Sequence, residues 1–143
     1  YTLEKVEVTK EMTEALGVNV LAAYKGRDLL CILESENDVI NIKPDLNKIK
    51  ELDGLLVHVS AQGSNFDTVS RSFAPKLNVN EDPVCGSGHC HIIPFWAKEL
   101  NKNNLIAYQA SERTGILHCT YLGDRVTLSG QAVLFSISDI KIS

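Results

Sequence analysis

Residues 87–100 restrict the possible folds of this 143-residue chain more than any other segment. They form the one stretch whose length and composition predict a long helix, written SGHCHIIPFWAKEL. Its apolar side chains cover most of the helical circumference, and a helix that is apolar on nearly every side is buried. We therefore expect this helix to be enclosed by the rest of the chain.

The remaining sequence is typical of short strands. Two β-rich runs, 18–24 and 28–33, flank a glycine turn and predict a hairpin. Short helices are expected at 10–16, ending at Gly17, and at 44–52. Further strands are predicted at 3–9, 55–60, 67–74, 105–110, 115–121, 125–129 and 132–137. The expected fold is α+β, with a curved, mostly antiparallel sheet partly enclosing one central helix.

Composition indicates a globular protein. The chain is 44% hydrophobic and 22% charged, which suits one packed domain. A net charge of −4 argues against nucleic acid as a partner, because proteins that bind it usually carry a basic stripe. No apolar run is long enough to span a membrane and the first residues lack the apolar core of a signal peptide, so we expect a cytoplasmic protein.

The ten residues 81–90, written EDPVCGSGHC, directly precede the apolar helix. Gly86 and Gly88 allow the backbone to approach a ligand closely, and Ser87 is expected to cap the helix with its hydroxyl. The first N–H groups of a helix have no partner within it, so they can bind an anion. A carboxylate fits this loop better than a phosphate, because the loop lacks the lysine of a P-loop.

Two side chains of the motif could perform chemistry beside this anion site. Asp82 could take or give a proton. Cys85 lies just before the helix, a position that lowers the pKa of a thiol, and its thiolate could act as a base or a nucleophile. A purely structural interpretation is also open, in which Ser87 only caps, Asp82 with Pro83 only turns the chain, and Cys85 only packs.

Other cysteines and histidines are expected to have structural roles. Cys31 and Cys119 lie in apolar strand-like runs, where free cysteine behaves as a small buried hydrophobe. His89 and His91 stand near two cysteines, but their spacing does not match a structural zinc site, so no metal is expected. The remaining histidines, His58 and His118, lie in predicted strands and are expected to pack in the core or on the surface.

The motif resembles the signature of the PhzF-like (phenazine biosynthesis-like) family, usually E-D-P-[VA]-T-G-S-A. The segments SRSFAPKLNVN, IIPFWAKELNK and QASERTGILHCTYLGDRVTLSGQAVLF resemble the family's preceding strand and loop, its central helix and its closing strands. The resemblance covers most of residues 18–140. It implies the fold of diaminopimelate epimerase and proline racemase, in which two like halves each wrap a barrel-like sheet around a central helix.

The resemblance also implies a function. The known PhzF enzyme isomerises an amino acid by moving a proton, without metal or cofactor, at a site between the halves, and members commonly form homodimers. By position, Asp82 and Ser87 match the active-site aspartate and serine. Gly86 and Gly88 match the loop that holds the substrate carboxylate, although Gly88 replaces the commoner alanine.

The chain departs from the family pattern at two points. Cys85 stands where threonine is usual, and C-G-S-G satisfies the cysteine loop of related racemases and epimerases. The glutamate-bearing stretch of the family's other half is missing, so residues 1–143 resemble the C-terminal half alone, as a single domain. Proton transfer would then require the N-terminal half or a second subunit.

Three functional hypotheses follow. The first is a cofactor-independent isomerase acting on a small carboxylate- or amino-acid-like substrate. The second is a cysteine-dependent racemase or epimerase, and the third is a ligand-binding or interaction module without catalysis.

Overall fold

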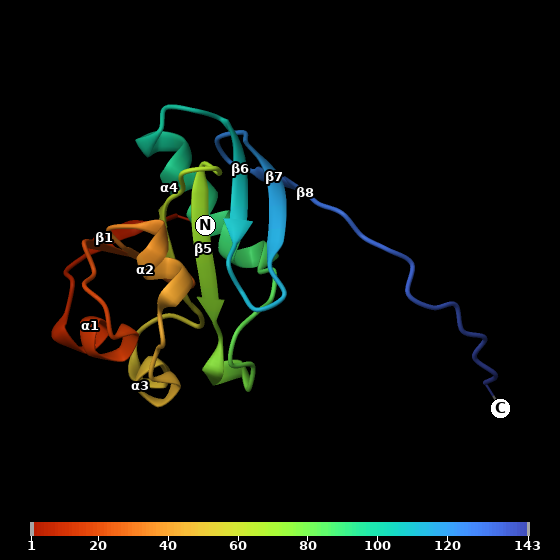
Figure 1. The fold of residues 1–143 in the computed structure, drawn as a ribbon, viewed down its shortest axis with the longest axis horizontal. Coiled ribbons are helices and arrows are strands. Elements are labelled where there is room, and N and C mark those ends of the chain that lie inside the picture. The colour runs from red at the N-terminus through yellow and green to blue at the C-terminus, as the bar shows by residue number, and fades with distance from the viewer. Residues whose placement is uncertain (1, 143) are drawn as a thin grey trace.

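The structure is a computed structural model that describes residues 2–142, and its strands form one eight-stranded sheet in sequence order (Figure 1). Neighbouring strands pair antiparallel except for β3 with β4 and β5 with β6, which are parallel. The prediction of a mostly antiparallel α+β sheet is confirmed. The strands are β1 (Glu4–Val6), β2 (Ala22–Lys25), β3 (Leu29–Ile32), β4 (Val57–Gln62), β5 (Thr68–Phe73), β6 (Asn104–Gln109), β7 (Gly115–Tyr121) and β8 (Val126–Ser129).

The helices begin and end at local signals. The first helix starts after Thr9, whose side chain accepts a hydrogen bond from the Met12 N–H, and ends at Gly17 in the left-handed region, φ 69°. The second helix, which was not predicted, starts with a capping box between Ser35 and Asp38. The helices are α1 (Lys10–Leu16), α2 (Glu36–Asn41), α3 (Leu46–Glu51) and α4 (Gly86–Glu99), with a 3₁₀ turn η1 (Pro75–Leu77).

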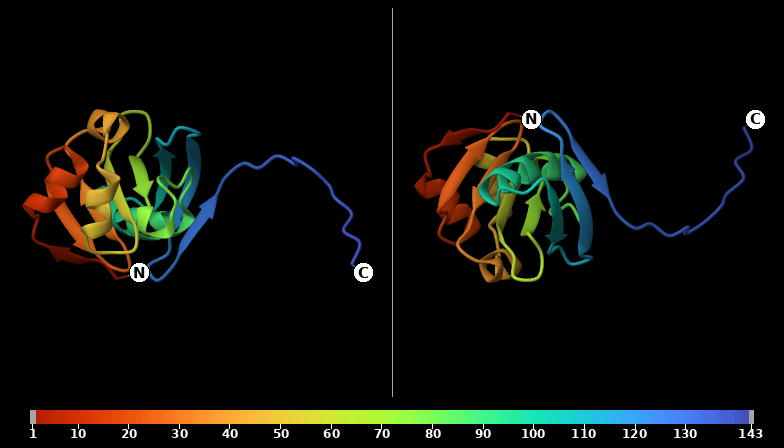
Figure 2. Two further views of the ribbon diagram at one scale, coloured as in Figure 1. Left: turned by 90° about the horizontal axis from the view of Figure 1, so that it is seen from below. Right: turned by 90° about the horizontal axis from the view of Figure 1, so that it is seen from above.

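The two parallel connections explain why helices cover both faces of the sheet. The connection from β3 to β4 contains α2 and α3, and the connection from β5 to β6 contains α4. Both connections lead from one strand to the next in the same direction across the sheet. Because β4 and β5 are antiparallel, however, the strands of the β3–β4 pair run opposite to those of the β5–β6 pair. Crossovers of one handedness must then lie on opposite faces. Figure 2 shows α4 on one side of the sheet and α2 and α3 on the other.

Each face carries its own core. Beneath α1 to α3, Leu29, Val59 and Phe73 are almost fully buried with apolar residues of those helices. On the opposite face, Ile92 and Trp96 of α4 pack with apolar residues of β3, β6 and β7. The central strands are therefore buried on both sides.

The expectation of a barrel-like sheet around the helix is wrong. Strands β1 and β8 are the two edges of the sheet, and among the described residues no pairing joins them. Since α1 to α3 occupy the second face, the sheet is a middle layer rather than a closed wall. Helix α4 buries only one side, and Lys98 and Glu99 near its end are exposed.

The predicted strand at 132–137 does not form. This segment is irregular and runs away from the body of the protein (Figure 1). Its apolar side chains are exposed, with Val133 at 90% and Phe135 at 97%. A strand needs a neighbour to accept its hydrogen bonds, and no strand of the described chain pairs with this segment.

None of the helices in residues 2–142 combines the length and the apolar character that crossing a membrane requires.

Candidate active site

The EDPVCGSGHC motif forms the loop that enters α4, as the sequence predicts. The N-cap is Cys85, whose Sγ accepts a hydrogen bond from the Gly88 N–H at 3.3 Å. The expectation that Ser87 caps the helix is wrong, because the helix begins at Gly86 and places Ser87 inside the first turn. Gly86 is exposed and Ser87 is half-buried, so the first turn faces the surface.

The loop is fixed by hydrogen bonds to β5 and β6. The Gln109 side chain accepts from the Cys85 N–H at 2.7 Å and donates to the Asp82 carbonyl at 2.5 Å. The Asp82 N–H donates to the Ser72 carbonyl at 2.9 Å. Because Gln109 is fully buried, this contact is shielded from water and holds the loop against the sheet.

The two carboxylates of the motif have different surroundings. Glu81 accepts two hydrogen bonds from Arg71, at 2.7 and 2.8 Å, in a bidentate ion pair. Asp82 is half-buried and accepts a hydrogen bond from the Val84 N–H at 3.1 Å. Glu81 therefore anchors the loop, whereas the Asp82 carboxylate forms no ion pair with the described residues.

The thiol of Cys85 is buried and its pKa is raised. Its exposed fraction is 2%, and burial raises its pKa, with the nearby Asp82 acting in the same direction. Hydrogen bonds from Ser87 and the Gly88 N–H lower the pKa by less. The expectation that the helix N-terminus favours thiolate at Cys85 is wrong, because desolvation outweighs it.

The other cysteines agree with their predicted roles. Cys31 and Cys119 are buried, and burial raises the pKa of each thiol to about 12. All four cysteines of the chain are free thiols.

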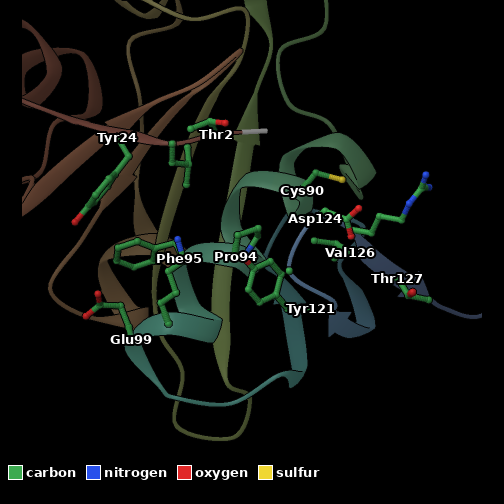
Figure 3. Close-up of a pocket in the computed structure, with 14 residues that line it drawn as sticks. Thr2, Tyr24, Cys90, Pro94, Phe95, Glu99, Tyr121, Asp124, Val126 and Thr127 are labelled. Carbon is green, nitrogen blue, oxygen red and sulfur yellow. The ribbon is translucent and has the colours of Figure 1, made fainter.

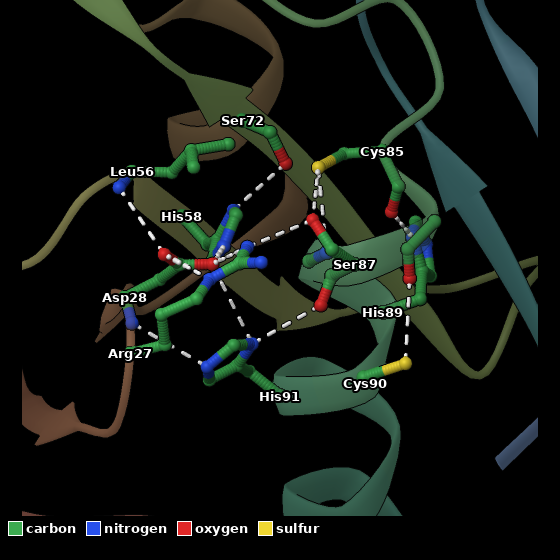
Figure 4. Close-up of polar contacts among 12 residues, drawn as sticks. Arg27, Asp28, Leu56, His58, Ser72, Cys85, Ser87, His89, Cys90 and His91 are labelled. Atoms are coloured by element: carbon green, nitrogen blue, oxygen red, sulfur yellow. Dashed lines mark hydrogen bonds and ion pairs between the residues drawn. The ribbon is translucent and has the colours of Figure 1, made fainter. Parts of the chain in front are cut away.

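Ser87 contacts a residue that sequence reasoning missed. Its Oγ accepts a hydrogen bond from Arg27 Nη2 at 2.9 Å (Figure 4). The same guanidinium pairs with Asp28, through Nε at 3.0 Å and Nη2 at 2.6 Å. Arg27 lies in the turn between β2 and β3, so this turn and the start of α4 lie side by side.

Asp28 is a fully buried carboxylate within a network of donors. It accepts from Arg27, from the Leu56 N–H at 3.3 Å and from His58 Nε2 at 3.1 Å. Burial alone would raise the pKa of Asp28, but hydrogen bonds from His58 and Arg27 outweigh it and hold that pKa well below the ordinary range. Asp28 is therefore ionised, and its charge is balanced by Arg27.

The histidines differ in environment. His58, which was expected only to pack, joins the buried network and lies 2.9 Å from Ser72 Oγ through Nδ1. His89 and His91 are fully buried on α4, each with Nδ1 bonded to a carbonyl one turn earlier, and burial lowers both pKa values. His118 is exposed on β7.

A group of three buried side chains could in principle coordinate a cation. One potential ligand atom from each of Asp28, His58 and His91 lies within 4.8 Å of the others. However, the Arg27 guanidinium lies 2.6 Å from the same Asp28 oxygen, and its positive charge opposes a cation there. The group fits a hydrogen-bond network better than a metal site.

Gly88 is required by its surroundings. A Cβ at this position would lie 2.7 Å from His58 Cε1, closer than real Cβ contacts, and a tight 3.1 Å from Cys85 Sγ. The imidazole of His58 therefore occupies the space that an alanine at 88 would need. The Gly88 N–H already donates to Cys85 Sγ. The backbone N–H groups of Gly86 and Ser87 are therefore the nearest candidates for binding an anion.

A hollow of the described chain lies elsewhere on α4. A groove of about 890 Å³ follows the exposed side of the helix between the two sheet edges, with Tyr24, Cys90, Phe95 and Tyr121 among its lining residues (Figure 3). A second hollow of about 470 Å³ adjoins the turn after β4. Neither is lined by residues 82–88, and the motif reaches the surface of the chain at Gly86.

No local pattern indicated the network at Arg27, Asp28 and His58. These residues reach Ser87 and Gly88 because β3 pairs in parallel with β4 and α4 packs across both. The one available signal was the charged pair at the start of the apolar run LLCIL.

The fold and the site together define an α+β protein with a candidate anion site at the start of its longest helix. Residues 3–137 match a family model described as phenazine biosynthesis-like protein, PhzC-PhzF. The chain belongs to this family.

Relatives and solved structures agree with this assignment. The chain is 44% identical over 140 residues to an uncharacterized isomerase of Pseudomonas aeruginosa, covering 97% of this chain and 54% of that protein. It is 38% identical to an uncharacterized isomerase of Halalkalibacterium halodurans, covering 92% and 51%. The chain thus spans about half the length of these curated relatives.

The solved structures show the same proportion. A PhzF family protein of Enterococcus faecalis superposes with a TM-score of 0.90 at 47% identity, covering 93% of this chain and 52% of that one. A putative PhzC/PhzF protein of Clostridium difficile superposes with a TM-score of 0.89 at 42% identity, covering 99% and 55%. The fold is therefore that of half of a PhzF-like protein.

Proposed function

We propose that this chain forms one half of an isomerase that moves a proton on a small carboxylate- or amino-acid-like substrate. The observation that supports the proposal is the loop leading into α4, which Gln109 holds against the sheet and in which both Asp82 and Ser87 are only half-buried. The naming of the relatives as isomerases supports the same class of reaction.

In this proposal the motif residues have separate roles. The Ser87 hydroxyl and the backbone N–H groups of Gly86 and Ser87 hold the substrate carboxylate. Asp82 accepts a proton from a substrate carbon, the electron pair moves within the substrate, and a proton returns to another carbon. No net oxidation occurs, so the step requires no electron acceptor, and we propose a reaction without cofactor or metal.

A second half or subunit would complete the site. The motif opens onto the surface and lines neither described hollow, so this chain alone does not enclose a substrate. The relatives are about twice as long as the matched region. We propose that the covering element is the N-terminal half of the family pattern or a second copy, and that the assembly is a homodimer in the cytoplasm, acting on neither nucleic acid nor membranes.

Two features of the loop bear on the alternative functions. The burial and raised pKa of Cys85 count against a cysteine-dependent racemase. The open motif is compatible with a binding module that does not catalyse, as far as the chain alone is concerned.

The test is proton exchange into deuterated water. Small amino acids and carboxylates are incubated with the chain, alone and together with the half that its relatives carry, and deuterium uptake is followed by proton NMR. We expect uptake with both halves, a loss of about 100-fold or more in Asp82→Asn, and retention in Cys85→Ser. Exchange that survives Asp82→Asn but disappears in Cys85→Ser would support the racemase. Binding without exchange in every case would support the module.

A further inference from the structure

A continuous series of hydrogen bonds connects β5 with the first turn of α4. Ser72 Oγ lies 2.9 Å from His58 Nδ1, and His58 Nε2 lies 3.1 Å from Asp28 Oδ2. Asp28 binds Arg27 at 2.6 and 3.0 Å, and Arg27 Nη2 lies 2.9 Å from Ser87 Oγ. Figure 4 shows these side chains converging from β4, β5, the turn between β2 and β3, and the helix.

The chemistry of these groups fixes the direction of most of the bonds. An ionised carboxylate only accepts, so His58 Nε2 donates to Asp28, and in the neutral ring Nδ1 accepts from the Ser72 hydroxyl. A guanidinium only donates, so Ser87 Oγ accepts from Arg27. The hydroxyl proton of Ser87 must therefore point away from Arg27.

The described residues offer only one weak acceptor for that proton. Cys85 Sγ lies 3.6 Å from Ser87 Oγ, and a thiol sulfur is a poor acceptor. A carboxylate oxygen is a much stronger one. Because Ser87 is half-buried at an exposed helix start, a substrate can reach its hydroxyl.

We propose that Arg27 is a positioning residue, which orients the Ser87 hydroxyl as a hydrogen-bond donor to the substrate carboxylate. Asp28, held by His58, fixes Arg27 in the required place. This inference rests on the proposed function and deepens it. It assigns the preference for a carboxylate-bearing substrate over an uncharged one to a residue outside the EDPVCGSGHC motif.

Gly88 belongs to the same arrangement. The His58 ring that supports Asp28 occupies the space of a Cβ at 88, at 2.7 Å. The supporting ring and the glycine are therefore structurally linked.

The experiment measures acetate binding with acetamide as the uncharged comparison. The backbone amide NMR signals of Gly86 and Ser87 are followed during titration of the full chain and its variants. The variants are Ser87→Ala, Arg27→Gln, the two combined, and Arg27→Lys. Arg125→Gln, which removes an exposed charge from the turn before β8, is the matched control. Since Arg27→Gln leaves Asp28 buried without its ion pair, Arg27→Gln with Asp28→Asn is the companion variant, and thermal melts verify folding.

We expect the wild type to bind acetate more tightly than acetamide. Ser87→Ala and Arg27→Gln should each weaken acetate binding about 10-fold. Because Arg27 acts through Ser87, the combined variant should be no weaker than Ser87→Ala, and Arg27→Lys should recover part of the binding. Losses that multiply to about 100-fold would overturn the inference in favour of direct anion binding by Arg27. Unchanged acetate binding in Arg27→Gln would also overturn it, while leaving the proposed function intact. A wild type that binds no acetate at Gly86 and Ser87 would overturn both.

Discussion

The two faces of the central sheet both carry an apolar core, but along β4 and β5 they have opposite character. On β4 and β5, one face presents Val59 and Phe73 to α1 to α3, whereas the other presents His58, Ser60 and Ser72 to α4. Successive residues of a strand point to opposite sides, so two adjacent positions can serve two different purposes.

The polar face is costly to build, and most of the cost is offset by hydrogen bonds. Buried polar groups destabilise a fold unless they find partners. Ser60 accepts from the Trp96 indole at 2.8 Å and donates to the Val69 carbonyl at 2.9 Å, and His58 is paired at both nitrogens. Within residues 2–142, only Ser70 Oγ and His89 Nε2 are buried side-chain atoms without a hydrogen-bond partner. On β4 and β5 the apolar face packs under α1 to α3, whereas the polar face fixes the start of α4 beside the second apolar core, which Ile92 and Trp96 form with β3, β6 and β7.

The largest expected effect separates the faces at neighbouring positions. Phe73→Ala removes a 1% exposed ring from the apolar core and should lower the free energy of unfolding by about 3–5 kcal/mol. Ser72→Ala, its neighbour on the polar face, should lower it by only about 1 kcal/mol, through the lost contact with His58. Urea denaturation of both variants measures this, and equal losses would contradict the distinction between the faces.

The next effect tests the buried charge through its pH dependence. Asp28→Asn should lower the free energy of unfolding by about 2–3 kcal/mol at neutral pH, since hydrogen bonds to a charged group are lost. The pKa of Asp28 is depressed in the folded protein, so its contribution is complete above the ordinary carboxyl pKa and is lost as pH falls through the folded value.

The difference between wild type and Asp28→Asn should therefore shrink below about pH 4, the ordinary range of aspartate. Denaturation at a series of pH values from neutral to acid measures the difference. A gap that widens in acid would show that the carboxylate is not stabilised by Arg27 and His58.

A smaller effect compares two glycines of the same helical turn. Gly88→Ala should lower the free energy of unfolding by about 1–3 kcal/mol, because its Cβ meets His58 at 2.7 Å. Gly86→Ala meets only Leu128, at 4.0 Å, and should be neutral or slightly stabilising in the helix. Adding His58→Ala to Gly88→Ala should recover part of this loss in stability, because the ring that meets the Cβ is removed. Thermal melts of the two single glycine variants and of the double variant measure these effects. A double variant that recovers no stability would show that the two positions are not coupled.

The smallest effect concerns the C-terminal segment. Removal of residues 131–142 should change the free energy of unfolding by less than about 0.5 kcal/mol, since these side chains are exposed. A larger loss would mean that the segment packs on the body of the chain. Comparison of the melting temperatures of the two lengths measures it.

Much of the fold was predictable because its signals are local. The bounds of α1 and β7, the hairpin of β2 and β3, and the start of α4 to within one residue follow from caps, turns and periodicity. Helix α2 was missed because it is six residues long and buries only Val39. The strand at 132–137 was wrong because alternation predicts a strand only where a neighbouring strand can pair with it.

The site was predictable only in part. Asp82, Cys85 and Ser87 lie consecutively in one motif, so the sequence places them together. Whether they carry the roles assigned to them stays a prediction. Arg27 and His58 lie far from the motif in the sequence, and their approach to it depends on the parallel pairing of β3 with β4. The state of Cys85 was misjudged because burial, which the sequence does not report, dominates its pKa.

The contact between Gly88 and His58 also limits which pairs of residues these two positions can hold together. An imidazole at 58 and a methyl group at 88 compete for one volume. A redesign of the loop that places alanine at 88 must therefore also replace His58 by a smaller side chain, and it would then give up the ring that supports Asp28.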